Sequence, residues 1–313
     1  MSSLRQTLAD RVVLLDGGLS TTLELLGHDI SGDLWSARLL HDEPEAITDA
    51  HAAFFAAGAE VATTATYQAT FDGFASHGMD RRTTAELMLR SVTLARRAAD
   101  EVADRPTWVA ASAGPYGAML ADGSEYHGRY GLTVDELRAF HRPRIDVLAS
   151  SGADVLAFET LPCAAEVEAV LAEADGTGID CWVSLSITGH HTRAGEPLTD
   201  VLAMVGDVTE VIAIGVNCST PRDATDAVHL AHGVGGRPAV VYPNSGEGWD
   251  AASRTWVTDE SPPLPADRFP VDGWPVDRWV HDGARLVGGC CRVTPDDIAA
   301  MAAQLRALAP RNV

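Results

Sequence analysis

The run Asp154-Val155-Leu156-Ala157-Phe158-Glu159 places four apolar residues in a row between two carboxylates. Continuous apolar character, without polar alternation, is typical of a strand that is covered on both faces, as in a parallel sheet flanked by helices. Each such run is followed by turn residues and then by a stretch with helical periodicity. Seven further runs of this kind recur along the chain, at Val12–Asp16, Glu60–Thr64, Thr107–Ser112, Cys181–Ile187, Val211–Asn217, Pro238–Tyr242 and Arg285–Gly289.

Eight strands that alternate with helices imply parallel β-α-β units. They predict an α/β fold, a single (β/α)8 TIM-type barrel covering residues 1–313. An open doubly wound sheet is the alternative, although no Gly-x-Gly-x-x-Gly fingerprint follows the first strand. Three stretches are too long for simple connections, namely 72–79, 119–132 and the Trp-rich segment 245–282. They predict long βα loops at the C-terminal face of the barrel, or surface excursions whose Trp side chains anchor them to it.

Several of the intervening segments carry recognisable helix ends. Pro44 and Gly58 bound one segment, because Pro favours the first turn of a helix and Gly its end. Thr133 and Glu136 predict a capping box at the start of another. The last helix is expected to begin after Thr294 and to bury four apolar residues at helical spacing: Ile298, Met301, Leu305 and Leu308.

The composition excludes several kinds of chemistry. All 23 basic residues are Arg, so there is no Lys for a Schiff base, for a pyridoxal phosphate aldimine or for a P-loop. With 44 acidic residues the net charge is −21, which argues against nucleic acid as a partner. No apolar run approaches the ~18 residues that would cross a membrane, and the first ten residues have no signal-type apolar core. We therefore expect a cytoplasmic protein.

Three of the five Cys residues fall at the C-terminal ends of predicted strands. Cys218 follows Asn217, and the pair Cys290-Cys291 follows two glycines, which we expect to give the backbone the freedom to turn both thiols inward. Strand ends of a barrel meet on one face, and converging thiolates suit Zn²⁺, with one coordination position left open. The alternative is that these Cys side chains are buried apolar residues. Cys163 and Cys181 are interpreted as structural.

The ligand set indicates a reaction class. Zinc held by three thiolates is electron-rich, so it is poorly suited to activating water and well suited to binding a substrate thiol that stays nucleophilic. This favours alkyl transfer to a thiol. A zinc hydrolase on the same barrel is the alternative, but the sequence has neither His-x-His after the first strand nor His-Glu-x-x-His. Asp16 and Glu159, at other strand ends, are candidates for a substrate ammonium, and the Gly17 and Gly18 amides for its carboxylate; both acids could instead cap helices or form ion pairs.

Motifs distributed along nearly the whole chain resemble those of the zinc-dependent homocysteine S-methyltransferase family. The resemblance is closest to the subgroup that uses S-methylmethionine or S-adenosylmethionine as methyl donor. It rests on Leu15-Asp16-Gly17-Gly18, Leu34-Trp35-Ser36-Ala37, Thr66-Tyr67-Gln68-Ala69-Thr70, Gly114-Pro115-Tyr116-Gly117-Ala118, Asp122-Gly123-Ser124-Glu125-Tyr126, Phe158-Glu159-Thr160, Gly215-Val216-Asn217-Cys218, Tyr242-Pro243-Asn244-Ser245-Gly246-Glu247 and Gly288-Gly289-Cys290-Cys291-Arg292.

The resemblance implies a role for each residue of the expected site. Cys218, Cys290 and Cys291 would be the zinc ligands. Homocysteine would bind with its amine on Asp16 and Glu159 and its carboxylate near Gly17 and Gly18. Asn217 and Asn244 would lie at the same rim, that is, at the C-terminal ends of the barrel strands. The stretches that contain Tyr67 and Tyr126 favour a sulfonium donor over betaine. Selenocysteine or selenohomocysteine as acceptor, and a betaine-type donor, stay open as alternatives.

Overall fold

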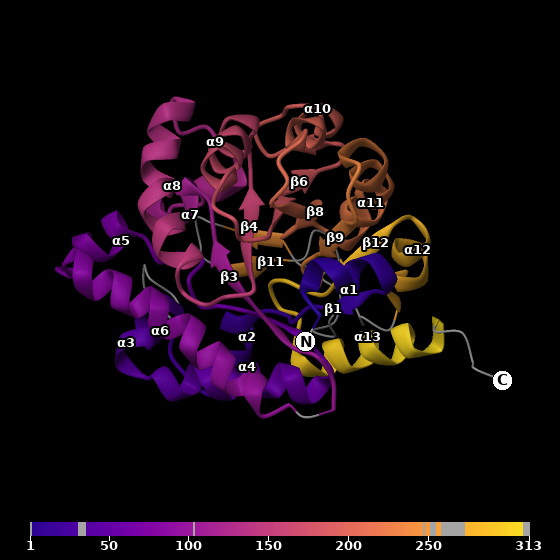
Figure 1. Cartoon of the computed structure of the whole chain (residues 1–313), viewed down its shortest axis with the longest axis horizontal. Helices are drawn as coiled ribbons and strands as arrows, with labels where there is room; N and C mark the ends of the chain where they lie inside the picture. The colour runs from indigo at the N-terminus through magenta and orange to yellow at the C-terminus, as the bar shows by residue number, and fades with distance from the viewer. Residues whose placement is uncertain are drawn as a thin grey trace.

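Eight parallel strands stand side by side in the order β1-β12-β9-β8-β5-β4-β3-β2 in a computed structural model of the chain. The structure describes residues 2–30, 36–102, 104–246, 248–250, 255–257 and 273–308. A bridge between Leu15 and Val61 joins the two outer strands of the order. The sheet is therefore a nearly closed barrel with helices around it (Figure 1), as the sequence predicts, and the open doubly wound alternative is wrong.

The strands of the barrel are β1 (Val13–Leu14), β2 (Val61–Thr63), β3 (Trp108–Ala113), β4 (Val155–Leu161), β5 (Cys181–Leu185), β8 (Val211–Asn217), β9 (Ala239–Tyr242) and β12 (Ala284–Val287). Two hairpins accompany it, formed by β6 (Ile187–Thr188) with β7 (His191–Thr192) and by β10 (Gly248–Asp250) with β11 (Thr255–Val257). The helices are α1 (Leu4–Asp10), α2 (Leu19–Leu25), α3 (Ser36–Asp42), α4 (Pro44–Ala57), α5 (Phe71–Ser76), α6 (Arg81–Asp100), α7 (Tyr116–Leu120), α8 (Val134–Ala149), α9 (Ala164–Ala174), α10 (Leu198–Leu202), α11 (Pro221–Gly235), α12 (Val276–His281) and α13 (Pro295–Leu308), with short 3₁₀ turns η1 (Ser124–Tyr126) and η2 (Ala203–Val205).

Most predicted helix ends are confirmed. Gly58 ends α4 in the left-handed conformation, and the Thr133 capping box opens α8. Two expectations are wrong. The stretch 72–79 is not one long loop, because Thr70 caps α5 there. Leu308 is 44% exposed, since the last turn of α13 extends past the surface that buries Ile298.

Alternate residues of the strands face two different apolar clusters. Ala110 and Ala157 belong to a cluster inside the barrel, whereas their neighbours Ala111 and Phe158 belong to the cluster between the strands and the helices. Leu4 and Leu8 of α1 join the inner cluster together with first residues of the strands, so α1 closes the N-terminal end of the barrel. The strands are thus covered on both faces, which is why their sequences are continuously apolar.

The last inward-facing positions of several strands are polar. They share the parity of the inner apolar residues and are all buried: Ser112, Glu159, Ser184, Asn217 and Tyr242. Buried polar groups need hydrogen-bond partners, and these side chains find many of theirs in one another. The barrel interior therefore changes from apolar to polar at its C-terminal end, where catalytic residues of this architecture lie.

The Trp-rich segment 245–282 lies partly outside the described residues. The motif residues Leu34, Trp35 and Glu247 also lie outside them. Trp249 and Trp256 are paired across the β10–β11 hairpin. Trp274 and Trp279 are buried against each other, with ring centroids 5.6 Å apart. Within the described residues, no helix combines the length and the apolar character needed to cross a membrane.

Gly215 on β8 provides a test of the barrel packing. A Cβ atom there would lie 1.9 Å from the Val240 carbonyl oxygen, which is backbone and has no room to move. We expect Gly215→Ala to lower the free energy of unfolding by about 3 kcal/mol. In the control Gly233→Ala, on α11, a Cβ meets nothing within 4 Å, and we expect a gain of about 0.5–1 kcal/mol because Ala favours helix. Urea unfolding of both variants measures the difference; equal stabilities would contradict the packing argument.

Candidate active site

The three cysteines at the strand ends come together at the C-terminal face of the barrel. The Sγ atom of Cys291 lies 4.0 Å from that of Cys218 and 4.0 Å from that of Cys290, and all three lie within 4.8 Å of one another. Cys218 follows β8 directly, whereas the pair follows β12, two strands away around the barrel. Cys163 and Cys181 are buried elsewhere as free thiols, which agrees with a structural interpretation.

The backbone geometry that brings the thiols together differs from the expected one. Gly288 and Gly289 do not adopt positive φ; instead Cys218 itself has φ of 46°. The two glycines are needed for space, because a Cβ would lie 2.6 Å from the Leu15 Cβ at position 288 and 2.2 Å from a Val293 methyl carbon at position 289. The predicted reason for the glycines is therefore wrong: they provide close approach, not an unusual backbone angle.

The cluster fits zinc in its donor chemistry and in its size. Zinc–sulfur bonds of ~2.3 Å in a tetrahedron place neighbouring sulfur atoms ~3.8 Å apart, close to the separations seen here. Without a metal, hydrogen bonds from Cys290 and Cys291 hold the pKa of the Cys218 thiol well below its usual value. One thiolate is thus stabilised by its neighbours, and the cluster could offer three sulfur ligands to one ion.

Asp16 lies just past β1 and is 3% exposed. Thr63 donates to both of its oxygens, from the backbone N–H at 2.7 Å and from the hydroxyl at 2.8 Å. Burial raises the pKa of Asp16 to about 8, and the nearby Glu159 adds to the rise. The side chain is therefore held in a fixed orientation in an environment that favours a cationic partner.

Glu159 lies on β4 and is buried as well. The hydroxyl groups of Ser112 and Tyr242 hydrogen bond to its carboxylate. Burial raises the pKa of Glu159 to about 7 against the effect of these bonds, and the charge on Cys218 contributes to the rise. Glu159 thus acts electrostatically on Asp16 and on Cys291, and the charge of Cys218 acts on Glu159, so Glu159 lies between Asp16 and the sulfur cluster in this chain of influences.

The raised pKa of Asp16 has a measurable effect on stability. Between pH ~4 and ~8 the unfolded chain loses the Asp16 proton while the folded chain keeps it, so stability falls as the pH rises through this window. We expect Asp16→Asn to be more stable than the wild type by a margin that grows by about 1.4 kcal/mol per pH unit across this window. Urea unfolding at pH 5 and pH 8 measures the margin. A margin that stays constant or shrinks towards pH 8 would show that Asp16 is not neutral in the folded chain.

Asn217 connects three parts of the rim. Its Oδ1 atom accepts from the Thr160 N–H at 2.8 Å and from the Ser184 hydroxyl at 2.9 Å, and its Nδ2 donates to the Thr160 hydroxyl. Nδ2 also lies 3.9 Å from the Cys290 Sγ. Thr160 has φ of 62°, which is unusual for a β-branched residue, and the bonds to Asn217 hold it there. Asn217 therefore supports the backbone beside the clustered cysteines.

Three further predicted residues, Asn244, Gly18 and Gly17, lie at the same end of the barrel. Asn244 is buried, and its Oδ1 accepts from the Cys291 N–H at 3.2 Å, which fixes the backbone of that cysteine. The Gly18 N–H donates to the Val293 carbonyl at 2.9 Å, so it is already bonded and does not point to a substrate carboxylate as expected. The close packing of Gly17 against Val293 and Phe54 leaves no space for a side chain there.

The two predicted tyrosines lie close to the sulfur cluster. The Tyr126 hydroxyl is 3.9 Å from the Cys218 Sγ. Burial raises the pKa of Tyr67 well above its usual value, and the charges of Glu125, Cys218 and Glu159 add to it, so the Tyr67 hydroxyl lies among these groups.

Sequence reasoning missed several side chains of the site. Arg193, beyond the β6–β7 hairpin, lies 5.7 Å from the Tyr126 ring centroid and donates to the Cys218 carbonyl at 3.4 Å. Glu125 is 3% exposed and lies next to Tyr126. The stretch Asp122–Tyr126 is part of the sequence resemblance, but only the fold shows that the carboxylate of Glu125 is buried. Nothing in the sequence around Arg193 indicates the contact.

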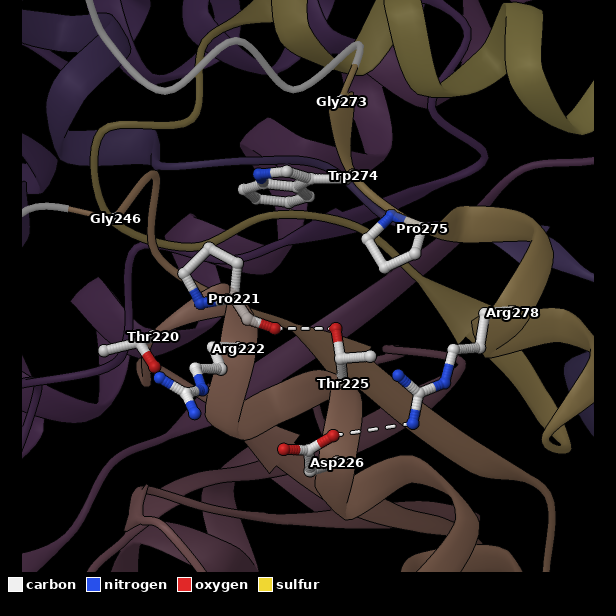
Figure 2. Close-up of a pocket in the computed structure, with 10 residues that line it drawn as sticks. All are labelled: Thr220, Pro221, Arg222, Thr225, Asp226, Gly246, Gly273, Trp274, Pro275 and Arg278. Carbon is white, nitrogen blue, oxygen red and sulfur yellow. Dashed lines mark hydrogen bonds and ion pairs between the residues drawn. The ribbon is translucent and has the colours of Figure 1, made fainter.

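A separate pocket of about 530 Å³ lies between the start of α11 and the start of α12 (Figure 2). Thr220, Trp274 and Arg278 contribute to its lining, and Arg278 pairs with Asp226 at 3.4 Å. None of the three clustered cysteines lines it. We therefore place the chemistry at the sulfur cluster and not in this pocket.

Comparisons with known proteins agree with this assignment. The sequence model of the family described as Homocysteine S-methyltransferase matches residues 13–305. The Homocysteine S-methyltransferase of Escherichia coli (strain K12) is 44% identical over 302 residues, covering 94% of this chain and 95% of that protein. Homocysteine S-methyltransferase YbgG of Bacillus subtilis (strain 168) is 40% identical over 313 residues, covering 95% of each.

A solved structure gives the same result. The metallated form of the homocysteine methyltransferase MmuM from Escherichia coli matches with a TM-score of 0.83 and 40% sequence identity, covering 94% of this chain and 96% of that one. The region that the family model matches, residues 13–305, contains all the strands of the barrel and all three clustered cysteines. The chain belongs to the homocysteine S-methyltransferase family.

Proposed function

We propose that this chain transfers a methyl group from a sulfonium compound, S-methylmethionine or S-adenosylmethionine, to the thiolate of homocysteine at a Zn²⁺ centre, giving methionine. The observation that carries the proposal is the cluster of three Sγ atoms within 4.8 Å of one another, together with the buried carboxyl group of Glu159, whose charge acts both on Cys291 and on the buried Asp16. A thiol site beside an ammonium site matches an amino acid that carries a thiol.

Different groups of the site bind the zinc ion and the amino-acid part of homocysteine. Cys218, Cys290 and Cys291 would hold the zinc ion, which when bound lowers the pKa of a substrate thiol and leaves its sulfur nucleophilic. Asp16 and Glu159 bind the homocysteine ammonium and so orient the amino acid. Since the Gly18 amide is bonded to Val293, we assign the contact with the substrate carboxylate to the backbone at Gly17.

The methyl transfer itself places few demands on acid–base groups. The donor leaves as a neutral thioether, so no side chain has to protonate it. The chain has to align donor and acceptor sulfur and to exclude water. We assign the donor side to Tyr67 and Tyr126, whose aromatic faces attract a cation. Asn217 and Asn244 hold the ligand cysteines in place through the bonds described above.

The remaining parts of the proposal follow from the same reasoning. Residues 1–313 act as one domain in the cytoplasm, with small-molecule substrates and with no nucleic acid or membrane as partner. The net charge of −21 supports this choice of partners. A zinc hydrolase would need a water-activating centre with His ligands, whereas the candidate cluster in the described residues consists of three Cys.

One assay tests the proposal. The zinc-loaded chain is incubated with homocysteine and, in parallel, with S-methylmethionine, S-adenosylmethionine or betaine, and methionine is measured. We expect methionine with one or both sulfonium donors and none above background with betaine. Turnover with betaine alone would replace the sulfonium donor, and no methyl transfer from any donor would refute the function. Selenohomocysteine in place of homocysteine tests the acceptor.

A further inference from the structure

Glu125 is a buried carboxylate that takes no part in the proposed binding of zinc, homocysteine or the methyl donor. It lies in the η1 turn and is 3% exposed. Its Oε2 atom is buried and has no hydrogen-bond partner. An unsatisfied buried acceptor is costly, so such a group in a folded protein calls for an explanation.

The backbone around Glu125 is firmly held, so the open oxygen does not result from a loosely placed loop. A Cβ at Gly117 would lie 2.4 Å from the Glu125 backbone nitrogen, which shows how closely η1 packs on α7. The Gln68 side chain in turn donates to the Ala118 carbonyl of α7 at 2.8 Å. Ser124 is bonded to Asp122 through its N–H at 2.9 Å.

Glu125 also lies near the reacting centre. The hydroxyl of the adjacent Tyr126 is 3.9 Å from the Cys218 Sγ. Glu125 is one of the groups whose charge acts on Tyr67, and the charge of Cys218 acts on Glu125. A buried carboxyl group thus stands beside two aromatic side chains at the sulfur cluster, and burial raises its pKa to about 7, so that a cationic ligand favours its charged form.

Glu125 differs from the other two buried carboxyls of the site in its hydrogen bonding. Asp16 and Glu159 already accept bonds from Thr63 and from Ser112, and they offer the directional acceptors that an ammonium with three N–H groups requires. A methyl sulfonium has no N–H group, and its charge is spread over the neighbouring carbon atoms. A suitable counter-ion is a carboxylate that keeps one oxygen open next to aromatic faces, and the Oε2 atom of Glu125 is such an oxygen.

We propose that Glu125 is the specificity-determining residue for the methyl donor and that its carboxylate faces the sulfonium group. This inference rests on the proposed function. In the transfer, the bond between the donor sulfur and the methyl carbon breaks with its electron pair staying on the donor sulfur, while the homocysteine thiolate supplies the pair for the new bond. The donor loses its positive charge as the reaction proceeds. Glu125 therefore stabilises the bound donor more than the transition state, and its removal acts mainly on the donor KM.

The test uses the zinc-loaded full chain with Glu125→Gln, which removes the charge and keeps the shape. We expect the KM for S-methylmethionine to rise about 30-fold, the KM for homocysteine to stay within about twofold and kcat to stay within about threefold. Glu125→Asp, which keeps the charge, restores part of the donor affinity. The matched control is Asp122→Asn, which removes an exposed charge from the same segment and leaves all three parameters unchanged.

A second measurement separates charge recognition from a merely structural role. Methionine is the neutral thioether counterpart of S-methylmethionine, and its inhibition constant against the donor is measured for each variant. We expect Glu125→Gln to leave this constant unchanged, because a neutral thioether gains nothing from the carboxylate. Equal losses for both ligands, or a rise in the homocysteine KM in place of the donor KM, would overturn the assignment.

The two levels of inference fail in different ways. If the wild-type chain turns over S-methylmethionine normally and Glu125→Gln has an unchanged donor KM, only the role of Glu125 is refuted. If the wild-type chain transfers no methyl group from either sulfonium compound, the proposed function fails, and the role of Glu125 fails with it.

Discussion

Cys218→Ala is expected to lose both the zinc ion and methyl transfer. In the proposed centre three sulfur atoms would hold the ion, and removal of one would leave two that do not close a stable tetrahedral site. We expect bound zinc to fall from about one equivalent to near zero and kcat/KM to fall at least ~10³-fold, because the acceptor thiol loses its activation. Metal analysis by mass spectrometry and an assay with S-methylmethionine measure the two effects.

The control for this experiment is Cys163→Ala. Cys163 is a buried free thiol at the N-terminus of α9, outside the three-sulfur cluster, so its loss tests for a general effect of removing a thiol. It should keep its zinc and its activity. Full turnover by zinc-free Cys218→Ala would refute the proposed metal centre, and zinc retention by that variant would refute Cys218 as a ligand. The same results are expected for Cys290→Ala and Cys291→Ala.

Glu159→Gln is expected to weaken homocysteine binding strongly and to leave the metal in place. The substitution preserves the shape that Ser112 and Tyr242 contact but removes the carboxylate to which we assign the substrate ammonium. Losing one partner of a buried charge pair costs about 2–3 kcal/mol, which corresponds to a rise of about 30- to 100-fold in the homocysteine KM. The KM for the donor should change little. Steady-state kinetics with each substrate varied in turn measures the split.

A matched control for Glu159 is Glu210→Gln. Glu210 is another buried glutamate, but it precedes β8 at the N-terminal end of the barrel, where it accepts from the Gly176 N–H at 3.0 Å. Its substitution should leave both KM values unchanged. An unchanged homocysteine KM in Glu159→Gln would refute the role given to this carboxylate, and equal changes in both KM values would indicate a general distortion of the rim.

The sequence predicts the barrel well because a strand that is buried on both faces has a continuous run of apolar residues, which is a local pattern. The β8 run Val211–Asn217 has the predicted bounds, since its apolar residues are covered on both faces from end to end. The run Cys181–Ile187 does not, because β5 ends at Leu185 and Ile187 pairs instead with Thr192 in a hairpin. That change of partner depends on contacts between segments, which a linear pattern does not contain.

The residues of the site likewise fall into those that local sequence patterns predict and those that depend on contacts between distant segments. The cysteines and the two carboxyls Asp16 and Glu159 could be predicted because each stands at a strand end, and the fold brings all strand ends to one face. Arg193 reaches the Cys218 carbonyl from the turn that follows β7, and the Gly18 amide donates to the carbonyl of Val293, far away in the chain. Such contacts depend on how loops fold back, so they needed the structure.

The network around Asn217 has a consequence for how the metal binds. Thr160 and Cys218 are held at left-handed φ angles by bonds that the protein makes within itself, and Asn244 fixes the backbone of Cys291. The three clustered sulfur atoms are therefore brought together when the chain folds. Zinc binding then requires little ordering of the chain, in contrast to small domains that fold only around their metal. The conformational entropy lost at the rim is lost during folding, so the ion and its thiol substrate meet a preorganised centre.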